Sequence, residues 1–204
     1  MDIFILFSMQ DIIQLKVSLA HSKPLIWRQL LVTNDTSFFE LHHIIQIAMG
    51  WENYHLFEFN LEGCRIGVVD EEESKGYGSG EVLDSTTVKL SDVITEQKEV
   101  FNYLYDLGDG WEHKIKIEKF HDIDNTLNYP TCIDGQKNCP PEDCGGIGYF
   151  CHSIDILKDK KHPDYKIIAL SFTKKYNPES FNKEKVNKQL GKLDRYIKKW
   201  LNGE

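Results

Sequence analysis

Strict alternation of apolar and polar residues marks the middle of the chain. It runs over residues 99–107, where one face carries three aromatic side chains, and again over 111–118, where the apolar face is aromatic and β-branched. A period of two with such residues predicts half-buried β-strands. Residues 108–110, Gly-Asp-Gly, suit a tight turn because glycine adopts positive φ without steric cost. We therefore expect an antiparallel hairpin here.

Other patterns predict the remaining elements. Ser37 and Glu40 form a capping box and Gly50 provides a left-handed end, so a helix is expected over 38–49. Strands are expected over Ile12–Ala20, Ile26–Thr33, His55–Glu62 and Ile66–Val69. Helices are expected over 90–96, 149–159, 163–172 and 182–200, while 70–81 and 125–148 have the composition of loops.

This order of elements indicates an α+β fold. We expect a mainly antiparallel sheet, a helix after the N-terminal hairpin, and a C-terminal group of helices. The length of 204 residues suits one large domain or two small ones. Since neither a repeat nor a linker interrupts the pattern, we expect a single domain over 1–204. Its parts are a sheet-rich body over about 11–121, a loop over 125–148 and a helical part over 149–201.

The tip of the predicted hairpin gathers residues that can bind or react. Asp106, Asp109 and His113 place two carboxylates and an imidazole close together. Such groups bind divalent cations or exchange protons. An Asp at a turn also bonds its own backbone, and a histidine on an apolar strand face is commonly a core residue. The sequence leaves both interpretations open.

A second unusual stretch is a loop that contains cysteines. Cys132, Cys139 and Cys144 lie near Pro140-Pro141 and Gly145-Gly146. Zinc bound to the three thiols would anchor this long loop. The spacing differs from that of zinc ribbons, however. The thiols also suit small buried apolar groups in a loop that its prolines and glycines hold.

The same loop carries two acidic residues, Glu142 and Asp143. We expect the segment 130–146 to pack on the hairpin over 103–118. The two carboxylates would then join those of the hairpin tip in one acidic site.

Three other histidines, His42, His43 and His55, lie on or beside the helix expected over 38–49. Histidines in such places more commonly make satisfied contacts in the core than ligate a metal. We therefore expect structural roles for all three.

Charge is unevenly distributed along the chain. The net charge is −8, but residues 151–204 carry thirteen Lys or Arg against seven Asp or Glu, a local charge of +6. The remainder carries −14, which disfavours non-specific binding of nucleic acid by the body. Any such binding is expected to be weak and to use the basic helix over 182–200. The basic residues of that helix include Lys188, Lys192, Arg195 and Lys199.

The sequence gives no sign of secretion or of a membrane partner. Ile3–Phe7 is too short for the core of a signal peptide and lacks a basic leader, and no apolar run reaches membrane-spanning length. Five cysteines cannot all pair within one chain. We expect a cytoplasmic protein with reduced thiols.

The two unusual stretches also carry a family resemblance. The motifs are Tyr-Asp-Leu-Gly-Asp-Gly-Trp-Glu-His at Tyr105–His113, Pro-Pro-Glu-Asp-Cys-Gly-Gly at Pro140–Gly146, and an N-terminal signature in Ile26–Arg28 and Leu41–Leu56. In these motifs the chain resembles the plasmid pRiA4b ORF-3-like family, whose members are also labelled as the passenger, TnpR-like protein of an insertion element. Leu107 stands where phenylalanine is usual. The resemblance implies an α+β fold with a mainly antiparallel sheet, and it implies no reaction.

Together these observations favour a binding or accessory module with a pocket between the 103–118 hairpin and the 130–146 loop, which takes an unidentified ligand or protein partner. One alternative is a metal-dependent hydrolase of phosphate esters, in which carboxylates hold a divalent metal ion and His113 moves protons. The other is weak nucleic-acid binding. The candidate binding residues are Tyr105, Asp106, Asp109, Trp111, His113, Glu142 and Asp143, and the candidate zinc ligands are Cys132, Cys139 and Cys144.

Overall fold

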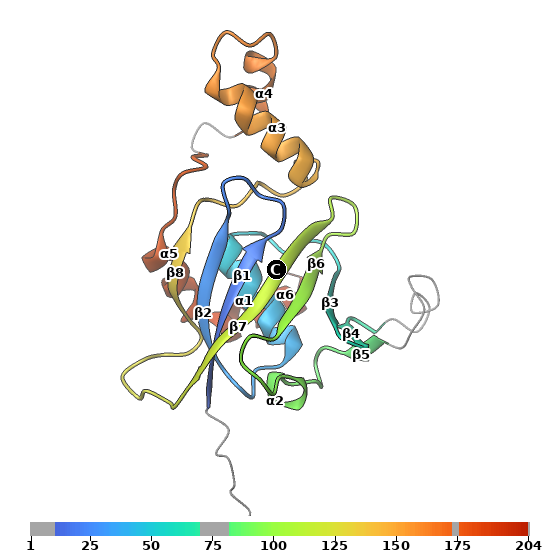
Figure 1. Cartoon of the computed structure of the whole chain (residues 1–204), viewed down its shortest axis with the longest axis vertical. Helices are drawn as coiled ribbons and strands as arrows, with labels where there is room; N and C mark the ends of the chain where they lie inside the picture. The colour runs from blue at the N-terminus through green and yellow to red at the C-terminus, as the bar shows by residue number, and fades with distance from the viewer. Residues whose placement is uncertain (1–10, 70–81, 173–175, 204) are drawn as a thin grey trace, which may run out of the picture.

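The computed structural model describes residues 11–69, 82–172 and 176–203. Eight strands form one sheet in the order β5-β4-β3-β6-β7-β1-β2-β8 (Figure 1). The strands are β1 (Ile12–Leu19), β2 (Trp27–Thr33), β3 (Phe57–Leu61), β4 (Cys64–Gly67), β5 (Val82–Asp84), β6 (Val100–Tyr105), β7 (Trp111–His121) and β8 (Thr131–Gln136). Neighbours are antiparallel except for β4 and β5, which confirms the predicted α+β class and the central hairpin of β6 and β7.

One face of the sheet is buried and the other is open to solvent. In β7 the side chains of Trp111 and Ile115 are buried, while Lys114 and Lys116 are exposed. The same alternation runs through β1 and β6, which pair with β7 on either side. The apolar positions of the three central strands therefore form one continuous buried layer.

Helix α1 (Phe38–Met49) covers the buried face. The predicted capping box is present, since the Ser37 hydroxyl accepts from the Glu40 amide and the Glu40 carboxylate accepts from the Ser37 amide at 2.8 Å. Gly50 ends the helix with φ of 89°. Most of α1 is buried because α5 (Lys183–Leu190) and α6 (Leu193–Leu201) pack on its other side. In Figure 1, α1 and α6 lie behind the sheet.

Two expectations about secondary structure are wrong. The predicted loop over 125–148 contains β8, an edge strand that pairs with β2. The segment 182–200 forms two helices, α5 and α6, with a break at Gly191 and Lys192. The break lets Leu190 and Leu193 both be buried, so packing on α1 decides the shape of this segment.

The other helices are α2 (Leu90–Val93), α3 (Gly146–Lys158) and α4 (Tyr165–Ser171). Helices α3 and α4 pack on each other and project beyond one end of the sheet (Figure 1). The loop expected over 70–81 lies outside the described residues. None of the helices in the described part of the chain has the length and apolar character needed to cross a membrane.

Candidate functional site

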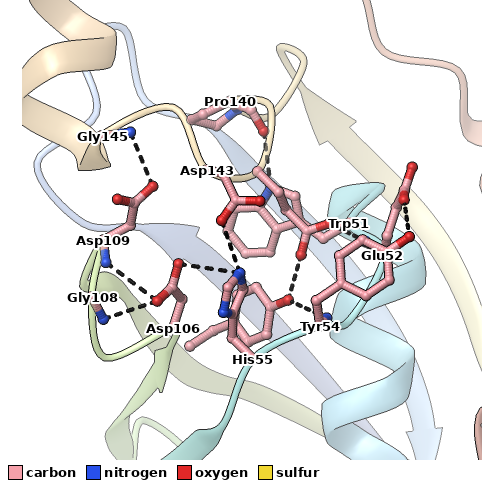
Figure 2. A network of polar contacts seen from close by, with 12 residues as sticks. Trp51, Glu52, Tyr54, His55, Asp106, Gly108, Asp109, Pro140, Asp143 and Gly145 are labelled. Atoms are coloured by element: carbon pink, nitrogen blue, oxygen red, sulfur yellow. Dashed lines mark hydrogen bonds and ion pairs between the residues drawn. The ribbon is translucent and has the colours of Figure 1, made fainter.

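Three segments meet at one end of the sheet: 51–55 after α1, the β6–β7 turn over 106–110, and the loop over 137–145 after β8 (Figure 2). The first two are neighbours because β3 pairs with β6 in the register Phe57↔Tyr105. Residues before β3 therefore lie beside residues after β6. The amide of Asp106 accordingly donates to the carbonyl of Leu56 at 3.0 Å.

Asn53 holds the first segment against the core. Its side chain lies 2.7 Å from His42 Nε2 and 3.0 Å from His43 Nδ1, and its carbonyl accepts from Trp200 Nε1 at 3.0 Å. Its φ of 65° is a left-handed conformation that asparagine tolerates better than most residues. The contacts of His42 and His43 agree with the structural roles expected for them.

The loop over 137–145 is tied to the end of α1. The buried guanidinium of Arg28 donates to the carbonyl of Ala48 at 2.8 Å and to that of Gln136 at 3.0 Å. A cation is favourable at the C-terminal end of a helix, where carbonyl groups point outward. Trp51 Nε1 donates to the carbonyl of Pro140 at 2.9 Å.

The loop also contacts the hairpin turn, as expected. Asp109 Oδ2 accepts from the amide of Gly145 at 3.1 Å (Figure 2). Gly146 has φ of +77°, and a Cβ placed on it would lie 2.6 Å from the carbonyl oxygen of Asp109. The backbone at position 146 lies so close to the backbone of Asp109 that only glycine fits there. The loop and the turn can therefore keep this short distance only with glycine at position 146.

Replacing Gly146 by Ala should therefore lower the free energy of unfolding by about 1–3 kcal/mol, through the clash and the positive φ. Gly148→Ala is the matched control, because a Cβ there meets nothing within 4 Å. Urea unfolding of both variants measures the difference. Equal stability of the two variants would mean that the close contact between loop and turn does not form.

The centre of the site is a group of three side chains, one from each segment. His55 Nε2 lies 3.0 Å from Asp143 Oδ1 and 3.6 Å from Asp106 Oδ2 (Figure 2). One ligand atom from each residue lies within 4.8 Å of the other two. The Asp106 side chain is 9% exposed and that of Asp143 is 69% exposed, so the group opens to solvent on the loop side.

The two oxygens of Asp106 have different partners. Oδ1 accepts from the amides of Gly108 at 2.9 Å and Asp109 at 3.3 Å, which closes the turn. Oδ2 faces His55. Asp106 thus closes the turn with one oxygen, and its other oxygen remains directed at His55.

Next to this group, Glu142 links the loop to β6. Its carboxylate accepts from the Tyr105 hydroxyl and, at 2.6 Å, from the amide of Glu52. Tyr105 also accepts from the amide of Tyr54 at 3.0 Å. Burial, together with the hydrogen bond and charge of Glu142, raises the pKa of Tyr105. Tyr105 therefore stays a neutral hydrogen-bond donor.

The electrostatic character of the site is acidic. Its five carboxylates belong to Glu52, Asp106, Asp109, Glu142 and Asp143. Within the described residues, none of the five forms an ion pair with a Lys or Arg, and His55 is the nearby basic group. Uncompensated carboxylates at short range attract a cation.

Two predicted site residues lie elsewhere. Trp111 and His113 are buried, and the His113 ring packs on Trp51 and Tyr103 with centroids 5.2 Å away in both cases. His113 does not belong to the group of His55, Asp106 and Asp143. A hollow of about 800 Å³ lies between the start of α1 and α6, and none of the predicted site residues lines it.

The three candidate zinc ligands are not brought together. Cys132 contacts the carbonyl of Asp134 and Cys139 contacts Met49, and in the described residues no three of the cysteines join a ligand group. Burial raises the pKa of Cys132 and Cys139 to about 11, and that of Cys144 to about 12. This arrangement fits the interpretation of the thiols as small buried groups and, among the described residues, gives the zinc hypothesis no support.

His55 is the residue that sequence reasoning missed. We expected a structural role for it because it lies just after the helix over 38–49, and its partners Asp106 and Asp143 are about 50 and 90 positions away. The signal that could have found it is the pairing of β3 with β6, which places position 55 beside the hairpin turn.

Comparisons with known proteins agree with the fold and the motifs. The family model "Plasmid pRiA4b ORF-3-like protein" matches residues 11–185. The uncharacterized protein y4hQ of Sinorhizobium fredii (strain NBRC 101917 / NGR234) is 33% identical over 184 residues, which cover 90% of this chain and 92% of that protein. The crystal structure of MM3350, a protein of unknown function from Methanosarcina mazei Go1, has a TM-score of 0.77 at 31% identity and covers 85% of this chain and 96% of that one. The chain therefore belongs to the plasmid pRiA4b ORF-3-like family, a family of uncharacterised proteins.

Proposed function

We propose that this protein is a cation-dependent binding module. His55, Asp106 and Asp143 hold one divalent cation, and the coordination positions that they leave open bind an anionic group of the ligand. The observation that carries the proposal is the convergence of three ligand atoms, from three separate segments, to within 4.8 Å of one another.

The spacing of these atoms suits a shared cation. Adjacent ligands of an octahedral cation lie roughly 3 Å apart, given bonds of about 2.1 Å. The His55 nitrogen lies 3.0 Å and 3.6 Å from the two carboxylate oxygens. Two carboxylates and an imidazole favour Mn²⁺ or Zn²⁺ over Mg²⁺, which prefers oxygen ligands.

The charges around the site explain why an anionic ligand would need the cation. Asp109, Glu142 and Glu52 surround the group and would repel an anion in the absence of the metal ion. The bound cation would reduce the negative charge of the site. The open coordination positions of the cation would then attract carboxylate or phosphate oxygens. Binding of the ligand would then depend on the cation.

Metal-dependent hydrolysis of phosphate esters is the competing hypothesis. It assigned proton transfer to His113, which is buried and outside the group. Tyr105, the polar neighbour of the site, keeps its proton because its pKa is raised. Turnover of a simple phosphomonoester by the manganese-loaded protein, abolished by Asp143→Asn, would favour the hydrolase over the binding module.

Calorimetric titration of chelator-treated, tag-free protein with MnCl₂ tests the proposal. We expect one cation per chain, and an affinity about tenfold or more weaker in Asp143→Asn. The fold should persist, because Asp143 has φ of 54° and asparagine tolerates this conformation.

Glu112→Gln is the matched control. It removes the same charge from an exposed position of β7 outside the group. Its affinity for Mn²⁺ should stay within about twofold of the parent. Equal losses in the two variants would indicate general attraction by an acidic surface and would refute a defined site.

A further inference from the structure

The open face of the sheet carries a continuous row of polar side chains. Strand pairing aligns one residue from each of seven strands, and every one is exposed or half-buried. In order across the sheet, the row consists of Arg65, Asn60, Asn102, Lys114, Ser18, Trp27 and Gln136. With strands about 4.8 Å apart, it extends roughly 29 Å. The row contains donors of hydrogen bonds at each position and no carboxylate.

A pair of cations lies beside the row. Lys16 in β1 is directly opposite Lys116 in β7. Like charges at such positions destabilise a sheet. Within the described ranges, Lys16, Lys114 and Lys116 form no ion pair, and the Lys16 ammonium lies 4.1 Å from the centre of the Trp27 ring. The ammonium groups of these three lysines are close together, so they are suited to bind an anionic partner.

Three carboxylates of the same face each lie beside a polar partner. Glu58 pairs with Arg65 at 3.3 Å, and Glu118 accepts a hydrogen bond from Gln14 at 3.0 Å. Glu112 lies 3.7 Å from His21. They therefore leave the three lysines available, although the chain as a whole is acidic.

We propose that this face binds single-stranded nucleic acid. Lys16, Lys114 and Lys116 contact phosphates, and the amides of Asn60 and Asn102 can hydrogen-bond base edges. An open sheet accepts unpaired bases lying along its surface, with an indole as a stacking partner. Helix α1, on which α5 and α6 pack, lies behind the sheet, on the face opposite the row (Figure 1). The proposal is independent of the cation site.

The test is fluorescence anisotropy of a labelled oligo(U) of about 12 nucleotides, in low salt with EDTA, so that the cation site plays no part. The test variant carries Lys16→Gln, Lys114→Gln and Lys116→Gln. We expect an affinity at least about tenfold lower, and a slope of log K against log salt that is smaller by about 2. The variant should fold, because it removes the opposed pair of like charges, and a thermal melt checks this.

The matched control carries Lys188→Gln in α5, Lys192→Gln at the break and Arg195→Gln in α6, in the segment where the sequence placed any nucleic-acid contact. It loses the same charge and should keep its affinity within about twofold. Equal losses in both variants, an unaffected sheet variant, or no binding by the parent at about 100 μM protein would each overturn the proposal. It would also be overturned if a labelled poly-glutamate peptide bound as tightly and with the same dependence on the three lysines.

Discussion

Lowering the pH from 7 to 5 is expected to reduce the free energy of unfolding by about 4 kcal/mol. The cause is a set of buried histidines, two in α1 and one in β7. Burial lowers the pKa of His43 and of His113 to about 4, and burial also lowers that of His42, which stacks on Phe57. Neither ring nitrogen of His113 has a hydrogen-bond partner in the described protein. The backbone groups of Tyr103 and Trp111 raise the pKa of His113, but by less than burial lowers it.

The free energy of unfolding falls at low pH because the unfolded chain takes up protons at a higher pH than the folded protein does. In the unfolded chain a histidine has a pKa of about 6.5, so it gains a proton as the pH falls through that value. The folded protein gains that proton only near pH 4 at His43 and His113. Stability is therefore fully present above pH 6.5 and is lost progressively toward pH 4. At pH 5 each of these two histidines accounts for about 2 kcal/mol.

Urea unfolding at pH 7, 6 and 5 measures this loss. His113→Phe keeps a ring of similar shape and removes the titrating group, so the loss between pH 7 and 5 should shrink by about 2 kcal/mol. His21→Gln replaces an exposed histidine and should leave the loss unchanged. A pH dependence that is the same in His113→Phe as in the parent would contradict the assignment.

Two substitutions of Asp106 should separate its two roles. In Asp106→Asn the amide oxygen can take the place of Oδ1 and accept from the amides of Gly108 and Asp109. The amide nitrogen then replaces Oδ2, the ligand atom that faces His55. We expect loss of manganese binding by about tenfold or more, with a change in the free energy of unfolding below about 1 kcal/mol.

Asp106→Ala should lose both roles. It leaves two turn amides without an acceptor and places alanine at φ of 57°, so we expect destabilisation by about 1–3 kcal/mol in addition to the loss of cation binding. Urea unfolding without metal and calorimetric titration with MnCl₂ give the two quantities. The account fails here if Asp106→Asn binds Mn²⁺ like the parent, or if it is destabilised as much as Asp106→Ala.

Local sequence signals were sufficient for much of the fold. The capping box at Ser37 and the left-handed Gly50 bound α1 correctly, because both ends depend on neighbouring residues. The alternation in β6 and β7 predicted both the strands and their buried face. Each of these features is encoded within a few positions of the chain.

The errors occur where distant segments decide the structure. β8 has weak alternation and exists as a strand because β2 offers it an edge, for example at Leu30↔Cys132. The break between α5 and α6 serves packing on α1. Local periodicity identifies neither β2 as the partner of β8 nor α1 as the helix on which α5 and α6 pack.

The site shows the same limit. Asp106 and Asp143 were candidates because their motifs are unusual, whereas His55 became a neighbour only through the pairing of β3 with β6. For His113 the sequence left a functional and a core role open, and the structure places its side chain on the buried face of β7. Burial is the stronger guide for a histidine on an apolar strand face.

The most direct test of the cation site is crystallographic. Crystals of tag-free protein grown with MnCl₂ would be measured near the manganese absorption edge, and an anomalous difference map calculated. The account predicts one strong peak, within about 2.3 Å of His55 Nε2, Asp106 Oδ2 and Asp143 Oδ1. A map without a peak at these atoms, or with its strongest peak beside Cys132, Cys139 or Cys144, would contradict it.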